Sequence, residues 1–421
     1  MVIKNDRRNL ARLHRYVWGK ILPVDFEESK SLLAAERQLI DIALSEKRQS
    51  AYGFTTLFGP NDNVSASSKE QNLLLKSHLL GQPAKLDKFT SRAIIGAKLL
   101  QISLGGSGLS ADTFVDLYNI AGDEYSISIP SNLSYGSGDV VPGAWVVYSV
   151  FGCQREWNAG DIISLINGNY ISTAYAYMVL HAMLSAFSRF LCMLGNFAIS
   201  PPPPYKGKFF GGIFDEIGVF RSAWNTPPQL PVSIRDISPI LEVSEESLIG
   251  LASRIDKSLG QPSANPLFSI TDKGVECYSQ SSFMNFGIRF ALAGVNDFIC
   301  LMSSYVQRST EYLSKIKYAE SNSVNLNLLE LTQAPKVSEA LRIQIESNHL
   351  PRDFSGSMSG GVEDIWDTAL MSSNKIFHNI EILESQLNIL EKCIRSNGYL
   401  DECNFREVES SLWEYLCSTK I

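Results

Sequence analysis

The sequence has no basic tract and no apolar leader at its N-terminus. It holds 37 Lys and Arg against 44 Asp and Glu, a formal net charge of −7, and the positive charges do not cluster. Nucleic acids attract proteins through concentrated positive charge, so we expect no nucleic-acid partner. Residues 1–8 are charged and lack the apolar run of a signal peptide.

Paired cysteines are also missing. The seven cysteines are scattered, odd in number and without a Cys-x-x-Cys pair: Cys153, Cys192, Cys277, Cys300, Cys393, Cys403 and Cys417. This pattern is typical of free thiols in a reducing compartment rather than of a disulfide framework or a zinc site. We therefore predict a cytoplasmic protein without a structural metal.

Only one run is long and uncharged enough to suggest a membrane span. Residues 169–188 carry no formal charge apart from a possible one on His181, and hydroxyl groups interrupt the run. A helix that is apolar on all sides can equally be the buried centre of a large helical protein. With no second span and no flanking Lys/Arg asymmetry, we expect a buried helix and no membrane partner.

What the chain does have is length and helical periodicity. Its 421 residues, 45% of them hydrophobic, are ample for a large core in one extended unit or two to three compact ones. Residues 1–25 are polar and mixed, which predicts an irregular arm, and the prolines and glycines of 201–212 form the clearest break in composition. Apolar residues at helical spacing predict helices over 26–45, 90–104, 112–119, 144–151, 169–188, 283–316, 337–347, 364–395 and 404–418.

The stretch around which the rest is organised is 134–144, with Gly136-Ser137-Gly138-Asp139 at its centre. Glycine lacks a Cβ, so a Ser-Gly peptide here can fold back on the carbonyl of Gly136. Attack by the Gly138 nitrogen on that carbonyl, with loss of one water there and of a second at Ser137, would give a five-membered electrophilic ring. The alternative is an ordinary turn, because Gly, Ser and Asp are common turn residues.

Residues 136–142 resemble the Ala-Ser-Gly-Asp-Leu-x-Pro segment of the aromatic amino acid ammonia-lyase and aminomutase family. In that family the tripeptide becomes the prosthetic group 4-methylideneimidazole-5-one (MIO), so the resemblance implies an MIO formed from Gly136, Ser137 and Gly138. Gly136 stands where the family has alanine, whose side chain takes no part in ring closure.

Further segments resemble the family in the same order along the chain. Residues 51–60 are similar to a mobile lid whose tyrosine is the catalytic base, which implies that role for Tyr52. A free tyrosine has a pKa of about 10, so the role requires a lowered pKa or a neighbouring donor. The alternative for Tyr52 is a packed loop aromatic.

Two more matches imply contacts with ring or substrate. Residues 70–81 resemble a helix that touches the substrate side chain through His78, as in the histidine-type lyases; a helix-capping or surface histidine is the alternative. Asn167 matches an asparagine that holds the ring and the substrate amine, and a generic Asn-Gly turn is its alternative.

In the C-terminal part the matches are partial. Residues 229–235 resemble a segment whose arginine grips the substrate carboxylate by a two-pronged contact, which implies that role for Arg235; a surface ion pair is the alternative. Val232 replaces a second catalytic tyrosine, and valine cannot donate a proton. Phe283 is retained from a further substrate-binding segment. Glu363 matches a glutamate near the substrate amine, with an acidic first helical turn as the alternative.

The resemblance implies a mainly α fold, with long antiparallel helices in a bundle and a loop-rich N-terminal part that carries the Gly-Ser-Gly segment. We predict an N-terminal lid and MIO-loop domain over 1–157 and a helical bundle domain over 158–421. The family also implies a homotetramer with shared active sites and a small amino acid as substrate.

The predicted function is that of an ammonia-lyase or 2,3-aminomutase acting on an aromatic or heteroaromatic, histidine-like amino acid. Two alternatives stay open. One is a diverged lyase, cyclase or dehydratase of the same fold that acts on a modified amino acid in specialised biosynthesis. The other is a non-catalytic homologue. The sequence does not name the substrate or separate lyase from mutase.

Overall fold

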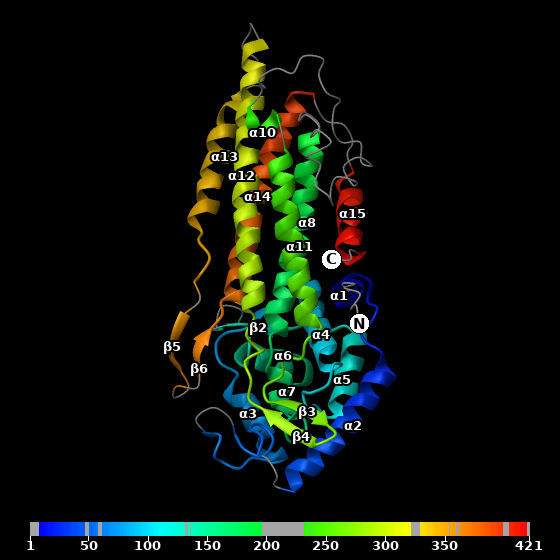
Figure 1. Ribbon diagram of the computed structural model, residues 1–421. Coiled ribbons are helices and arrows are strands. Elements are labelled where there is room, and N and C mark those ends of the chain that lie inside the picture. The colour runs from blue at the N-terminus through cyan, green and yellow to red at the C-terminus, as the bar shows by residue number, and fades with distance from the viewer. Residues whose placement is uncertain are drawn as a thin grey trace.

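Long helices lie side by side and form one half of the molecule (Figure 1). The computed structural model describes residues 8–46, 50–57, 61–130, 134, 136–195, 231–235, 237–320, 329–352, 354–358, 361, 363–398 and 404–418. In the bundle, α12 packs against α11, α13 and α14, and α14 packs against α8. These helices are α8 (Tyr170–Gly195), α11 (Ser238–Leu259), α12 (Phe286–Glu320), α13 (Leu329–Ser347) and α14 (Ala369–Ser396).

Apolar residues at helical spacing hold the bundle together. On α14, Ile376, Ile380, Leu383, Leu387 and Leu390 recur every three or four residues and are all buried. Such a stripe puts one face of the helix against its neighbours. By contrast, α8 is buried on almost every side, as the uncharged run 169–188 predicted.

The other half is built from shorter helices and loops around α4. Asp87 caps α4 by accepting hydrogen bonds from the amides of Phe89 and Thr90, and the helix is buried from Thr90 to Ile102. The elements of this half, together with the peripheral helices, are α1 (Arg8–Gly19), α2 (Phe26–Ser45), η2 (Ser68–Glu70), α3 (Gln71–Ser77), α4 (Lys88–Ile102), α5 (Ala111–Gly122), α6 (Val141–Phe151), α7 (Asp161–Ile166), α10 (Val232–Arg235) and α15 (Phe405–Ser418).

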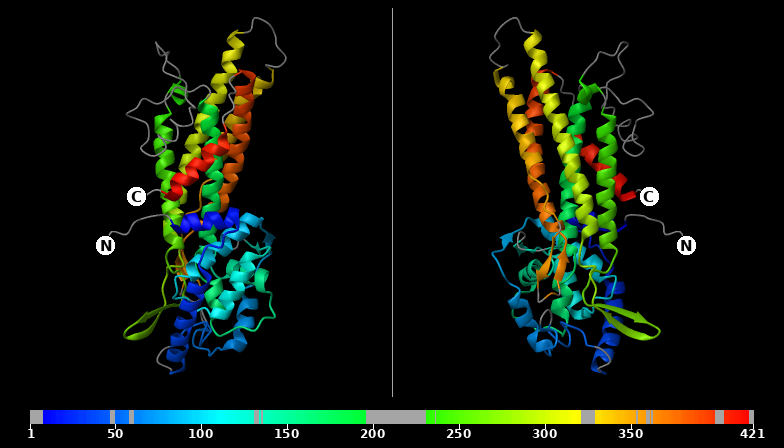
Figure 2. Two further views of the ribbon diagram at one scale, coloured as in Figure 1. Left: turned by 90° about the vertical axis from the view of Figure 1, so that its right-hand side faces the viewer. Right: turned by 60° about the vertical axis from the view of Figure 1, so that its left-hand side comes forward.

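The described strands form three two-stranded antiparallel sheets. β1 (Ala84–Lys85) pairs with β2 (Ser128–Ile129), and β5 (Phe354–Met358) pairs with β6 (Glu363–Trp366) through an irregular register. β3 (Leu267–Thr271) and β4 (Gly274–Tyr278) make a hairpin that projects from the body in both views of Figure 2.

The mainly α bundle fold is confirmed, with two local corrections. Residues 8–19, predicted as part of an irregular arm, form α1, whose Leu10, Leu13 and Val17 are buried on one face. The helix predicted over 364–395 begins only at Ala369, because the preceding residues pair as β6. The predicted break at 201–212 lies outside the described residues, and the boundary at 157/158 stays a prediction.

Two composition-based expectations also change. Cys192 is disulfide-bonded, whereas Cys153, Cys277, Cys300, Cys393 and Cys417 are not, so the prediction of seven free thiols was wrong. By length and composition, a second stretch, Phe286–Lys315, joins Asp161–Gly195 as a candidate membrane span. The first stretch is 72% buried inside the fold, as expected of a core helix.

Candidate active site

The Gly-Ser-Gly segment is a tight loop that leads into α6. The Ser134 hydroxyl oxygen accepts hydrogen bonds from the amides of Gly136 and Gly138, at 3.2 and 3.1 Å. The carbonyl of Ser137 accepts from the amide of Ser172 in the first turn of α8, at 3.0 Å. The side chain of Ser137 is fully buried, yet its Oγ has no hydrogen-bond partner among the described residues. The backbone is therefore held firmly while the serine oxygen remains unused.

The two glycines that flank Ser137 differ in what they require. Gly138 has φ +89°, and an added Cβ would lie 2.8 Å from Ile171 Cβ. A side chain there would meet both backbone strain and a clash, so only glycine fits. At Gly136 an added Cβ would lie 3.5 Å from the Asp367 carbonyl oxygen, an ordinary contact. The alanine of the family motif would fit at this position.

Asp139 lies buried beneath the loop. Its Oδ1 accepts from the Gly168 amide at 2.8 Å, and its Oδ2 accepts from Asn167 Nδ2 at 3.4 Å. Burial raises the pKa of Asp139 to about 7, while the Gly168 amide, the Lys98 charge and the Val140 amide oppose that rise. The carboxyl group is therefore poised to gain or lose a proton near neutral pH.

Lys98, on α4, is the buried cation of the site. Its Nζ donates to the carbonyl of Asn167 at 2.8 Å and lies 4.5 Å from the centre of the Tyr170 ring. Burial lowers the pKa of Lys98 to about 7, with Asp139 acting in the opposite direction. Our motif comparison missed this residue, although a lysine at position 98 within the apolar run of 93–102 was a visible signal.

Several buried polar atoms around the loop have no described partner. They include Asn167 Oδ1 and Glu363 Oε2 in addition to Ser137 Oγ. Glu363 lies close enough to Asp139 to raise the pKa of that carboxyl group. It lies on β6, so its alternative as the first turn of a helix was wrong. Buried polar atoms normally have partners, and a cluster without them is typical of a ligand-binding site.

Tyr52 faces the same region from the N-terminal loop. Its hydroxyl group donates to Asn265 Oδ1. Burial raises the pKa of Tyr52 to about 12, against a hydrogen bond from Ser279. The lowered pKa that a tyrosine base requires is thus not present in this arrangement.

Gln71 anchors the Tyr52 loop. Its Nε2 donates to the Gly53 carbonyl at 3.1 Å, and its Oε1 accepts from the Ile162 amide at 3.2 Å. The loop packs so closely that a Cβ on Gly53 would lie 2.4 Å from Ile163 Cγ2. Gln71 thereby ties Tyr52 to the start of α7.

Three further predicted residues lie on other elements. His78 ends α3, with its Nδ1 2.7 Å from the Leu74 carbonyl oxygen, and burial lowers its pKa. Phe283 is half-buried just before α12. Arg235 is exposed on α10, which lies at the far end of the bundle (Figure 1). One chain thus brings together Tyr52, Gly136–Gly138, Asn167 and Glu363, but not Arg235.

Sequence comparison identifies relatives for the N-terminal part. Residues 17–194 match the family model for aromatic amino acid lyases. Histidine ammonia-lyase from Streptococcus sanguinis is 32% identical over 143 residues, which are 33% of this chain. The match spans only 28% of that relative's own length.

Structural comparison extends the similarity over the whole chain. Phenylalanine aminomutase from Pantoea agglomerans has a TM-score of 0.77 at 16% identity, covering 98% of this chain and 94% of that one. Ergothionase from Treponema denticola has a TM-score of 0.76 at 15% identity, covering 97% and 96%. Histidine ammonia-lyase from Trypanosoma cruzi gives 0.72 at 17%, covering 96% and 86%.

At these identities the structural likeness shows the fold, which is the helical-bundle class of the ammonia-lyases and aminomutases. Residues 17–194, which are less than half of the chain, are similar to the aromatic amino acid lyases.

Proposed function

We propose that the chain is a carbon–nitrogen lyase or 2,3-aminomutase that removes or shifts the amino group of an aromatic or histidine-like amino acid. The observation that carries the proposal is Ser137, whose hydroxyl oxygen is buried and unpartnered in a loop where Gly138 has φ +89°. An ordinary turn serine would be solvated or bonded, because burying an unpaired hydroxyl group costs free energy.

The residues present fit an MIO group formed from Gly136, Ser137 and Gly138. No side chain is required at Gly136, none is tolerated at Gly138, and the Ser137 oxygen that would leave as water has no hydrogen bond to give up. The group would supply an electrophile at the position of the Ser137 side chain.

The surrounding residues would bind the substrate and hold its protons. Asn167 Oδ1 and Glu363 Oε2 are unused acceptors, suited to a substrate ammonium group. Tyr52 would take the β-proton of the substrate as a phenolate. In the present arrangement its hydroxyl group keeps its proton and donates it in a hydrogen bond to Asn265, so a neighbouring donor would have to stabilise the phenolate first.

The first test is the intact mass of the purified chain. We expect a mass short by two waters, mapped to the peptide that contains 136–138, and ammonia release or amino-group shift in a screen of aromatic amino acids. Ser137→Ala should restore the full mass and abolish turnover without unfolding the chain. Ser188→Ala, which replaces a fully buried serine on α8, is the matched control and should keep both the mass loss of two waters and the turnover. Full activity in Ser137→Ala would contradict the proposal.

We also propose that Arg235 grips the substrate carboxylate from a neighbouring subunit of a homotetramer. The support is the placement of α10 at the opposite end of the bundle from the Ser137 loop. Ser137→Ala and Arg235→Gln should each be inactive alone but partly active when co-expressed, because mixed oligomers contain some intact sites. Co-expressed variants that stay inactive in verified mixed oligomers would refute shared sites.

A second candidate keeps the fold but changes the reaction. Val232 is 67% exposed on α10 and cannot replace a catalytic tyrosine. A diverged lyase, cyclase or dehydratase acting on a modified amino acid fits this loss, and one protein of similar fold is an ergothioneine-degrading enzyme. Turnover of a modified histidine, without ammonia release from ordinary aromatic amino acids, would favour this candidate. An unmodified mass with no ligand binding would instead indicate a non-catalytic homologue.

A further inference from the structure

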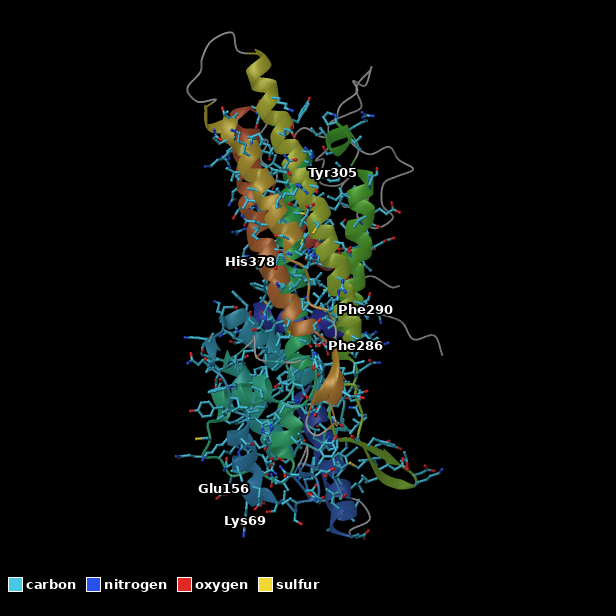
Figure 3. The ribbon with its side chains drawn as sticks, turned by 90° about the vertical axis from the view of Figure 1, so that its left-hand side faces the viewer. Lys69, Glu156, Phe286, Phe290, Tyr305 and His378 are labelled. Atoms are coloured by element: carbon cyan, nitrogen blue, oxygen red, sulfur yellow. The ribbon has the colours of Figure 1, made fainter. Side chains whose placement is uncertain are left out.

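A polar cavity of about 230 Å³ lies where the end of α11 meets the start of α12. Figure 3 shows Phe286, the first residue of α12, at the junction between the bundle and the other half. The volume is several times the roughly 30 Å³ that a water molecule occupies in the liquid. The lining residues are mostly polar and include Asn169, Arg254, Lys257, Ser258, Ser263 and Asn285.

The charge of this cavity is unbalanced. Arg254 and Lys257 both line it, no lining residue is acidic, and neither cation makes an ion pair with a described carboxylate. Asp256, between them in sequence, instead accepts a hydrogen bond from the Leu10 amide at 2.9 Å. The Arg254 and Lys257 side chains are both exposed to solvent at the edge of the cavity, and no described carboxylate pairs with either of them.

The start of α12 adds further positive charge. A Cβ built on Gly287 would lie 3.5 Å from Arg254 Cδ and 3.8 Å from its Nη1, so the guanidinium lies against the first turn. The N-terminus of a helix carries a partial positive charge, which repels a cation placed there. Arg254 is exposed, so solvent screens this repulsion, but the guanidinium and the helix end would both attract an anion placed between them.

The first-turn amides are also uncapped. Asn285, just before the helix, directs its Nδ2 toward Ser172 Oγ and Thr173 Oγ1, at 3.0 and 3.1 Å. Within the described part of the chain, no side chain accepts a hydrogen bond from the amides of Gly287 and Ile288. Both residues line the cavity. Uncapped helix amides are donors for a bound anion.

The wall of the cavity leads back to the candidate active site. Asn169 is buried, and its Oδ1 accepts from Gln101 Nε2 at 2.7 Å while its Nδ2 donates to the Ser282 carbonyl at 2.9 Å. Asn169 lies two residues after Asn167, and Ser172, which bonds Asn285, also donates its amide to the Ser137 carbonyl. The cavity is thus a separate space that shares a rigid wall with the Ser137 loop.

We propose that this cavity binds a small oxyanion, a carboxylate or a phosphate, between Arg254, Lys257 and the first turn of α12. The guanidinium and ammonium groups supply charge-assisted hydrogen bonds, and the helix amides supply further donors. The site is distinct from the Ser137 centre, so it does not depend on the proposed reaction.

The test uses inorganic phosphate and malonate as probes, at constant ionic strength, in titration calorimetry with the full chain. Saturable binding of either probe is expected, and the probe that binds identifies the preferred anion. Arg254→Gln/Lys257→Gln should weaken that binding by about tenfold or more, since it removes two charged donors. Lys69→Gln/Lys273→Gln removes the same charge from exposed positions outside the cavity. Lys69 lies at the end of the molecule farthest from the bundle (Figure 3), so this double variant should bind the probe as the unchanged chain does.

A second measurement separates binding from a structural role. In anion-free buffer, Arg254→Gln should keep or raise the melting temperature, because it removes the repulsion at the helix end. Ser137→Ala should bind the probe as the unchanged chain does, so failure of the proposed reaction leaves this result intact. The proposal is overturned if neither probe binds, if both double variants bind alike, or if Arg254→Gln lowers the melting temperature without any anion.

Discussion

Both halves of the molecule contain buried polar atoms without a described partner, including Ser253 Oγ and Ser309 Oγ in the bundle, but they differ in what surrounds those atoms. In the bundle, Gln386 is fully buried and its amide bonds the Ser303 and Ser338 carbonyls at 3.1 and 3.0 Å. Around the Ser137 loop, three buried polar oxygens have no described partner, and a carboxyl group and an amine both titrate near neutral pH. Unpartnered polar atoms occur in both halves, and it is their combination with titratable groups around the Ser137 loop that is typical of a ligand-binding site.

The largest expected effect is a side chain at Gly138. Gly138→Ala should abolish ring formation and turnover and reduce the free energy of unfolding by about 1–3 kcal/mol, because it adds strain at positive φ and a clash with Ile171. Gly136→Ala is the matched variant and should keep the ring, since its Cβ meets only ordinary contacts. Intact mass and urea unfolding measure both. Equal loss in the two variants would contradict the loop geometry.

The next prediction compares the stability lost when a buried cation, Lys98, and a part-exposed cation, Arg189, are replaced. Lys98→Met should lower stability by about 3 kcal/mol, because it leaves the Asn167 carbonyl unpaired and Asp139 without a nearby positive charge. Arg189→Met, which removes an ion pair with Glu384 at the bundle surface, should cost about 1 kcal/mol or less. Urea unfolding of both variants measures the two losses in free energy of unfolding. A larger loss in Arg189→Met than in Lys98→Met would contradict the prediction.

Substitutions at two buried glutamines test whether a loss of activity can be distinguished from a loss of stability. Gln71→Leu and Gln386→Leu should each cost about 1–2 kcal/mol, because each leaves backbone groups unpaired. Turnover should fall only in Gln71→Leu, since that residue holds the Tyr52 loop. Activity measured on fully folded samples checks this, and the idea fails if the bundle variant loses as much.

The smallest effect is a pH dependence at a cluster of aromatic residues that joins α1, α8 and α15. Burial lowers the pKa of His181 from 6.5 to about 4, and burial and His181 together lower that of His14 to about 4. Both groups bind more protons when unfolded, so they reduce stability as the pH falls from about 6.5 to 4.

Thermal unfolding across this pH range should show a decline that is smaller by about 1–2 kcal/mol in His181→Gln. Asp139 acts with the opposite sign, because its raised pKa reduces stability as the pH rises from about 4 to 7. An unchanged pH profile in His181→Gln would contradict the assignment.

Much of the fold could be predicted from periodicity. The helices over 26–45, 90–104 and 404–418 were predicted within a few residues, because buried apolar positions recur every three or four residues. Residues 8–19 were misread as an arm because their arginines hid a narrow apolar face. The sequence around Glu363 predicted the start of a helix, but these residues form β6 and pair with β5. Pairing between two segments is not visible in a local sequence pattern.

The sequence by itself determined that a serine lies between two glycines ahead of an acid and that uncharged segments form the core, since both are set by local chemistry. Only the tertiary structure decided that Lys98 lies under Asn167, that Asn265 holds the Tyr52 proton, and that α10 carries Arg235 away from the Ser137 loop. It also decided that Arg254 lies across the start of α12. These relations depend on distances between residues far apart in the chain, and those distances are set by how the helices pack rather than by any local preference.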